Sequence, residues 1–419
     1  MKIVYISHRI PFPPNKGDKI RSFNEIKYLS ERHEIHLACL ADAERDLKYV
    51  EDLKKYCKSV CVVVIQPKLA KVKSLIYLLS KKPLSARYFY SKRLQESIDQ
   101  ILSTTDIDVI FCFSSPMAEY VFRSKFLAAQ KQRPASSNQR PKLIMDFIDV
   151  DSDKWNQYAQ HAKWPLSGVY RIESRRLAEY EREVAETFDH SIFCTHAEER
   201  IFKTKSPHIG NVVVVQNGVD LDYFSPNYLP SPGSANQSPP ISLQQPIIVF
   251  TGVMDYFANV EGVVWFSNEV FPLVKKKVPE AKFCIVGSNP TREIRELAKG
   301  DGVIVTGYVP DTREYLKRAA VVVVPLRIAR GIQNKILEAM AMGLAVVATP
   351  KAFEGMKEEL RSDLMIEDGS KTFADSVVKL IRESHLRGKI GQNARKGMEN
   401  YYNWSKNLRI LDTILYNLR

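Results

Sequence analysis

The sequence predicts an α/β protein made of two doubly wound domains. Its 419 residues exceed the roughly 150 residues of one common domain. Short apolar runs alternate with helix-length segments in two arrays, which is typical of parallel sheets flanked by helices. A stretch rich in Pro, Ser and Gln separates the arrays and indicates a linker. We therefore expect two sheets whose carboxyl edges face one cleft.

The first array contains apolar runs without alternation, as expected for strands buried on both faces. The predicted strands are Lys2–Ser7, Ile35–Leu40, Val60–Ile65, Val109–Phe113, Leu143–Ile148, Ser191–Cys194 and Val212–Val215. Leu166–Phe188 carries Glu/Arg pairs at helical spacing, and Ala128–Pro141 is a low-complexity stretch that we predict to be a surface insertion. This array defines a first domain at residues 1–226.

The second array follows the linker, which we place at residues 227–246. Its predicted strands are Ile247–Phe250, Lys282–Val286, Val303–Thr306, Ala320–Pro325 and Leu344–Ala348. They define a second domain at residues 247–402. Because doubly wound sheets bind ligands at the carboxyl ends of their strands, we expect functional residues in the loops that follow them.

Composition excludes several protein classes. Hydrophobic residues make up 45% and charged residues 26% of the chain, which excludes a disordered, collagen-like or coiled-coil protein. The net charge of +13 favours a polyanionic partner: nucleic acid, a phosphorylated metabolite or an anionic membrane. No apolar run reaches the roughly 18 residues of a membrane span. The six cysteines lack CxxC spacing, which predicts reduced thiols of a cytoplasmic protein and no zinc site.

The most informative segment is Val321–Val347. It reads as a buried strand, a loop containing Gly331, and a helix that begins near Asn334. Free backbone N–H groups at a helix start attract anions. Three cations, Arg327, Arg330 and Lys335, would complete a site suited to a diphosphate.

A carboxylate follows on the same helix face. Glu338 lies three residues beyond Lys335 and could accept hydrogen bonds from ribose hydroxyls beside that diphosphate. A solvated Lys/Glu pair at a helix start is the alternative, because this spacing is common.

Five further segments occur in a characteristic order. They are Val215–Asp220 with Phe224–Pro226, Phe250–Gly252, Ile285–Pro290, Thr306–Pro310, and Tyr402–Ser405. With Val321–Val347 they resemble the retaining family 4 (group 1) glycosyltransferases of the two-domain GT-B fold. The resemblance implies two Rossmann-like domains and a C-terminal helix, residues 403–419, that completes the first domain.

The same resemblance assigns donor-binding residues. Gly252 belongs to the first donor-side loop, Gly287 and Ser288 to the second, and Tyr308 and Val309 to the stretch that contacts the base. Arg327, Gly331 and Glu338 would also bind the donor, and Arg330 and Lys335 would stabilise the leaving diphosphate. The family implies transfer of a hexosyl group with retained anomeric configuration and without metal or cofactor.

The N-terminus carries a narrower resemblance. Ser7–Arg21 and Asp146–Trp155 are similar to a sugar transferase subgroup of bacterial PEP-CTERM and exopolysaccharide systems. Lys16 and Gly17 would then lie on the acceptor side, and Asp149 would lie near the acceptor hydroxyl as a catalytic residue. A proline-rich loop and a helix start explain the first segment equally well, and helix capping by Ser152 or Asp153 the second.

Asp149–Asp153 also has the appearance of a metal-binding DxD or calcium motif. The segment lacks the Gly and the terminal Glu of an EF-hand loop. The family that it resembles does not require a metal, so we expect none here.

The sequence departs from the family pattern at the donor site. Arg330 stands where the family often has a Glu, eight positions before Glu338. Val253 follows Gly252, and Asn259 lies near the position of an expected Lys. The diphosphate charge would then fall mainly on Arg327, Arg330 and Lys335.

A long basic stretch, residues 53–95, contains eleven Lys or Arg and no Asp or Glu. Apolar and aromatic residues alternate with the cations, which predicts a surface that docks on anionic lipid. A solvated basic helix or an RNA-binding surface is the alternative. No RNA-binding motif is present, so we expect no nucleic acid partner.

These observations predict an enzyme that moves a hexosyl group from a UDP- or GDP-linked sugar to a lipid-linked or polysaccharide acceptor in exopolysaccharide biosynthesis. It would be cytoplasmic and peripheral at the inner face of the membrane. Two alternatives remain: a GT-B-like sugar-nucleotide epimerase that shares the donor site, and a non-enzymatic basic membrane- or RNA-binding protein.

Overall fold

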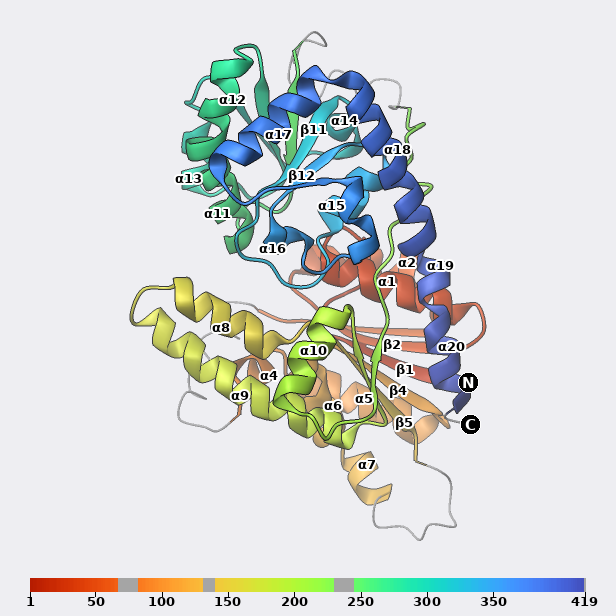
Figure 1. Ribbon diagram of the computed structural model, residues 1–419. Helices are drawn as coiled ribbons and strands as arrows, with labels where there is room; N and C mark the ends of the chain where they lie inside the picture. Colours follow the sequence, from red (N-terminus) through yellow and green to blue (C-terminus); the bar gives the residue numbers. More distant parts are fainter. Residues whose placement is uncertain (67–81, 131–139, 230–244, 418–419) are drawn as a thin grey trace. The chain divides into compact units, whose positions relative to one another are not determined.

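The computed structural model describes residues 1–66, 82–130, 140–229 and 245–417 (Figure 1). The chain divides into two compact units. The first comprises Met1–Gln216 and Leu408–Arg419, and the second comprises Asn217–Asn407. The predicted domain boundary at residue 226 lies inside the second unit. Most of the predicted linker, 227–246, and of the predicted insertion, 128–141, lies outside the described residues.

The first unit is built on a parallel seven-stranded sheet with the order β3-β2-β1-β4-β5-β6-β7. The strands are β1 (Lys2–Ser7), β2 (Glu34–Ala41), β3 (Ser59–Val64), β4 (Val109–Phe113), β5 (Lys142–Ile148), β6 (His190–Phe193) and β7 (Val212–Val214). Every predicted strand of this domain is present, within two residues at each end. The central strands β1 and β4 are almost entirely buried, as their continuous apolar sequences require.

Helices cover both faces of this sheet. They are α1 (Gly17–Ser30), α2 (Val50–Leu53), α4 (Leu84–Tyr88), α5 (Lys92–Thr104), α6 (Ala118–Phe122), α7 (Lys125–Gln130), α8 (Asp151–His161), α9 (Leu166–Thr187), α10 (His196–Lys205) and α20 (Arg409–Asn417). The C-terminal helix α20 lies against α1, where Asp412 accepts hydrogen bonds from Tyr28 and Arg32, both at 2.6 Å. Leu411, Ile414 and Leu415 form its buried face.

The second unit contains a parallel six-stranded sheet with the order β10-β9-β8-β11-β12-β13. Its strands are β8 (Ile247–Thr251), β9 (Lys282–Val286), β10 (Val303–Gly307), β11 (Ala319–Val324), β12 (Val346–Ala348) and β13 (Met365–Ile366). Its helices are α11 (Phe257–Trp265), α12 (Phe271–Lys277), α13 (Arg292–Leu297), α14 (Arg313–Leu316), α15 (Asn334–Ala341), α16 (Pro350–Phe353), α17 (Ser370–Arg382), α18 (Ser384–Tyr401) and α19 (Trp404–Asn407).

The strand orders locate the expected binding positions. In both sheets the order reverses beside the first strand, between β1 and β4 in one unit and between β8 and β11 in the other. Crossover connections diverge at such a switch point and leave a crevice at the carboxyl edge. The α/β class and the two doubly wound sheets are confirmed. No helix among the described residues is long and apolar enough to cross a membrane.

Candidate functional site

The second unit brings two glycine loops into backbone contact at the carboxyl edge of its sheet. Gly252 follows β8 and Gly287 follows β9. Gly287 has a φ of +154°, and a Cβ atom there would lie 1.6 Å from the carbonyl oxygen of Gly252. The N–H of Met254 donates to the carbonyl of Ser288 at 2.8 Å and ties the loops together. Only glycine satisfies this approach at position 287.

The loop between β11 and α15 lies across the switch point from Gly252. Gly331, in this loop, has a φ of +60°. A Cβ atom on Gly355 would lie 2.2 Å from the carbonyl oxygen of Gly331, so the loop is packed directly on the backbone after α16. This packing holds the start of α15 in place.

Lys335 and Glu338 are desolvated together on α15. Burial lowers the pKa of Lys335 to about 8, although the carboxylate of Glu338 opposes this shift. Burial also raises the pKa of Glu338 to about 7, against the effect of Lys335. An ammonium group short of solvation beside a helix N-terminus gains most from an incoming anion.

Asn259 on α11 orients this lysine. Lys335 Nζ donates to Asn259 Oδ1 at 3.1 Å, and Asn259 Nδ2 donates to the carbonyl of Val253 at 2.9 Å. A Cβ atom on Gly252 would lie 2.7 Å from Asn259 Nδ2. The amide therefore fills the space above Gly252, near the position where the family pattern has a lysine.

The two arginines of the β11–α15 loop are held by different carboxylates. Arg327 lies 3.5 Å from Glu261 of α11, and its side chain is 55% exposed. Arg330 lies 3.8 Å from Glu354, and its side chain is mostly buried. A bound diphosphate would have to compete with these ion pairs, which gives Lys335 the more direct role.

The residues predicted to contact the base follow the edge strand β10. Tyr308 is 76% exposed, whereas Val309 packs against the core of the unit. An exposed aromatic ring beside a packed aliphatic side chain is suited to stacking against a planar ligand.

Sequence analysis missed Tyr223 as a site residue. Burial raises the pKa of Tyr223, and the carboxylates of Asp311 and Glu338 contribute to that shift. The guanidinium of Arg313 lies 3.6 Å from the centre of the Tyr223 ring. The carboxylate of Glu338, the predicted ribose ligand, thus acts electrostatically on Tyr223. Tyr223 directly precedes Phe224–Pro226, one of the family-like segments of the sequence. This position was the signal in the sequence that pointed to Tyr223.

Asp149 follows β5 in the first unit, on strained backbone. Ile148 has a φ of +69°, a left-handed conformation that is unusual for a β-branched residue and that concentrates at functional sites. Cys194 Sγ donates to Asp149 Oδ1 at 3.1 Å. Burial raises the pKa of Asp149, and Lys154 opposes this shift.

A charged network fixes the elements around this loop. Arg21 of α1 lies 2.7 Å from Asp146 of β5 and 3.1 Å from Glu25, and all three side chains are fully buried. Tyr5 donates to Glu25 at 2.7 Å. The network fastens α1 to the sheet directly beneath the loops after β1 and β5. The predicted acceptor-side residues Lys16 and Gly17 lie exposed at the start of α1.

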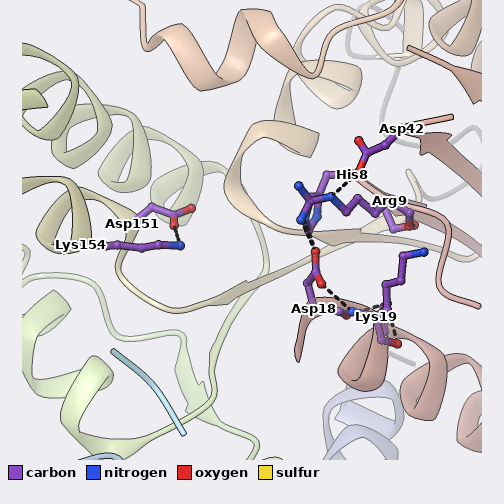
Figure 2. Close-up of polar contacts among 9 residues, drawn as sticks. His8, Arg9, Asp18, Lys19, Asp42, Asp151 and Lys154 are labelled. Carbon is purple, nitrogen blue, oxygen red and sulfur yellow. Dashed lines mark hydrogen bonds and ion pairs between the residues drawn. The ribbon is translucent and has the colours of Figure 1, made fainter. Parts of the chain in front are cut away.

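A second polar cluster that sequence analysis missed surrounds the β1–α1 loop (Figure 2). His8 Nε2 lies 3.2 Å and Arg9 lies 2.6 Å from Asp18, and Arg9 donates to Asp42 at 3.0 Å. His8 and Arg9 hold the pKa of Asp18 well below its usual range, despite its burial. The signal was the His8-Arg9 pair directly after the first strand. Figure 2 also shows the ion pair of Asp151 with Lys154 on α8, at 3.7 Å.

No group of three or more His, Cys, Asp or Glu suited to a metal ion occurs in the described part of the chain.

Part of the chain is similar to a known protein family. Residues 245–383 match the family model for glycosyl transferases group 1. This match lies within the second unit. A 44.6 kDa protein of the cps region of Klebsiella pneumoniae is 21% identical over 97% of both chains. A glycosyltransferase of Methanocaldococcus jannaschii is 30% identical over 19% of this chain and 21% of its own length.

Solved structures show the fold of the whole chain. HepE of Anabaena, in complex with UDP and glucose, matches with a TM-score of 0.68 at 15% identity over 99% of each chain. Sucrose-phosphate synthase of Thermosynechococcus elongatus matches with a TM-score of 0.69 at 14% identity over 100% of this chain and 99% of its own. The chain therefore has the GT-B fold.

Proposed function

We propose that this protein transfers a hexosyl group from a UDP- or GDP-linked sugar to a lipid-linked or polysaccharide acceptor in exopolysaccharide biosynthesis, with retention at the anomeric carbon. The observation that carries the proposal is the desolvated pair of Lys335 and Glu338. This pair lies near the contacting loops of Gly252 and Gly287, within the residues that match the group 1 glycosyltransferase model. A cps-region relative and a neighbour that binds UDP support the polysaccharide context and the nucleotide donor.

The donor half of the proposed mechanism is electrostatic. Lys335, together with the N–H groups at the start of α15, neutralises charge on the leaving diphosphate, and this charge grows toward the transition state. Arg327 and Arg330 contribute as the diphosphate displaces their ion pairs. Glu338 accepts hydrogen bonds from the ribose hydroxyls. We propose that neither a metal nor another cofactor takes part.

The acceptor half of the proposed mechanism uses the first unit. Asp149 is presented to the acceptor hydroxyl by the strained turn at Ile148, while Lys16 and Gly17 border the acceptor. We further propose a cytoplasmic protein that associates with the inner membrane face. Of the basic stretch 53–95, residues 67–81 lie outside the described residues.

The first test is calorimetric titration of UDP, GDP, ADP and their sugars into the wild type, followed by NMR of the products formed with a membrane extract as acceptor. We expect one nucleotide to bind, and we expect transfer with an unchanged anomeric configuration. Epimer formation without an acceptor would favour the epimerase alternative. A stable fold that binds none of the nucleotides would contradict the proposed donor site.

Donor affinity should depend on pH through Lys335. The diphosphate binds the protonated amine, and in the free protein that amine has a pKa of about 8. We therefore expect the affinity for the nucleotide to fall as pH rises through about 8. Calorimetry across this range checks the step. Lys335→Met should bind weakly with no such step, and a wild-type profile that is flat from neutral to alkaline pH would contradict the assignment.

Asp149→Asn should separate chemistry from donor binding. The substitution keeps the shape of the side chain but removes the carboxylate that faces the acceptor, so we expect turnover to fall about 100-fold. The Kd of the nucleotide, measured by calorimetry, should not change. Asp153→Asn, on the following helix, is the matched control and should retain wild-type turnover. Equal turnover in both variants would remove Asp149 from the mechanism.

A further inference from the structure

The hairpin of α8 and α9 ends in an exposed apolar turn. Trp164 is 86% exposed and Leu166 is 55% exposed. Pro165 lies between them and Lys163 precedes them, and both are exposed. Contact with water does not stabilise these apolar side chains. An exposed apolar patch on a folded protein marks an interaction surface. We define residues 163–166 as the hairpin tip.

The hairpin extends the tip away from the β5 loop. Figure 1 shows α8 and α9 lying side by side, drawn in yellow. Helix α8 begins at Asp151 and has 11 residues, which corresponds to about 16 Å of length. The residues by which α9 joins the core, Tyr180 and Val184, lie in its second half. The first half of α9 packs against α8 and leaves the tip clear of the sheet.

Aromatic rings join the two helices beneath the tip. The rings of Trp155 and Tyr170 lie 5.1 Å apart, and those of Trp155 and Tyr158 lie 5.9 Å apart. This cluster connects α8 to α9 about midway along α8. The hairpin tip is therefore held by two helices that are packed together. Because the tip is already held in place, less conformational entropy is lost when it binds a partner.

Charge is distributed unequally along the hairpin. Between Asp153 and Glu173 the sequence contains no Asp or Glu, but it contains Lys154, Lys163 and Arg171. Lys154 pairs with Asp151 near the sheet, whereas Lys163 and Arg171 are exposed. The acidic residues of the hairpin all lie toward the sheet. The tip end is thus cationic as well as apolar.

We propose that the hairpin tip docks this protein on an anionic lipid bilayer. Trp rings prefer the headgroup level of a bilayer, and Lys and Arg beside them pair with lipid phosphates. A second copy of the chain fits less well, because a symmetric contact would bring the cations of both tips together. A saccharide site would need several polar side chains beside Trp164, and the hairpin tip offers only Lys163 next to Pro165 and Leu166.

The proposed docking site adds a membrane contact to the proposed function. The biological purpose of this contact rests on that function. The tip and Asp149 belong to one connection, because Asp149 lies two residues before α8 begins. A bilayer held at the tip would bring a lipid-linked acceptor to the carboxyl edge of the first sheet. Docking itself needs no donor, so it can be measured separately from transfer.

The test is co-sedimentation of the full chain with vesicles of phosphatidylcholine alone or mixed with phosphatidylglycerol, without nucleotide. We expect binding only to the anionic vesicles, and about tenfold weaker binding for Trp164→Ala. Tyr416→Ala removes another exposed ring of the first unit and should bind like the wild type. Lys163→Glu should also bind more weakly. Circular dichroism and nucleotide affinity, unchanged in all variants, would show that neither the fold nor the donor site is affected.

Brominated lipids provide an independent readout. They should quench part of the wild-type tryptophan fluorescence, and Trp164→Phe should abolish the quenching. Wild-type binding by Trp164→Ala, with loss of binding instead on replacing Lys68, Lys71 and Lys73, would place the contact in the stretch 53–95 and overturn the proposal. A fluorescence change with soluble oligosaccharide but not with vesicles, or loss of a dimer in Trp164→Ala, would overturn it as well.

Discussion

Lys335→Ala should reduce turnover of the donor by about 100- to 1,000-fold, and the variant should remain folded. This is the usual effect of removing one preorganised group that stabilises charge in the transition state. The amine is already desolvated in the free protein, since burial lowers its pKa to about 8. A group in this state has given up part of its hydration before the donor arrives, which strengthens its interaction with a developing diphosphate charge. Alanine cannot replace this charge.

The kinetics of the variant should show where the charge acts. Because the interaction strengthens as the sugar–phosphate bond breaks, we expect kcat to fall more than KM rises. The matched control is Lys389→Ala, which removes an exposed lysine of α18 in the same unit and should retain full activity. Lys335→Arg should restore part of the rate. Unchanged kcat in Lys335→Ala, with a melting temperature like that of the wild type, would remove this lysine from the mechanism.

Asn259 lies near the position where the family pattern has a lysine, and its contacts show how the site can function without that lysine. Its amide bridges Lys335 and the carbonyl of Val253. Lysine at this position would add a second cation beside Lys335. The asparagine instead orients the existing cation of Lys335. Asn259 thus acts through Lys335 as a positioning residue.

The fold could be predicted because parallel strands buried on both faces are continuous apolar runs. The strand that was missed, β13, has only two residues, Met365 and Ile366, too few for any periodicity to register. The unit boundary was placed ten residues too late to coincide with Gln216. Its cause is a distant contact: the N–H of Val219 donates to the carbonyl of Tyr402 at 2.8 Å, and local sequence carries no sign of it.

The candidate site was predictable where one element carries it. Lys335 and Glu338 share a helix face, and their spacing alone places them together. Glu338 acts electrostatically on Tyr223, which belongs to a different segment, and Arg9 pairs with both Asp18 in the first turn of α1 and Asp42 directly after β2. Such constellations depend on strand order, which sequence periodicity does not determine.

Gly287→Ala should have the largest effect on stability, because its Cβ atom would lie 1.6 Å from the carbonyl oxygen of Gly252. Neither atom belongs to a flexible side chain, so the backbone of one loop must move. The φ of +154° adds strain for any other residue. We expect a loss of about 3 kcal/mol or more in the free energy of unfolding. Urea denaturation of the two proteins measures the difference.

Gly388→Ala is the control because it makes the same chemical change in the same unit. Gly388 lies in helix α18, and a Cβ atom there would meet nothing within 4 Å. Alanine should therefore stabilise the helix by about 0.5 to 1 kcal/mol. The two positions differ in the space around the new methyl group and in backbone conformation, so opposite signs are the result expected from the loop contact together with the strain at Gly287. A Gly287→Ala variant as stable as the wild type would show that the loops of Gly252 and Gly287 are not in contact.

The loop contact also predicts an effect on donor binding that is separate from folding. Gly252 lies beneath Asn259, and a displaced carbonyl at Gly252 would shift the amide that orients Lys335. At a temperature where Gly287→Ala is still folded, we expect its nucleotide affinity to be at least tenfold weaker than that of the wild type. Gly388→Ala should bind normally. Unchanged affinity in folded Gly287→Ala would mean that Lys335 is positioned by α15 alone.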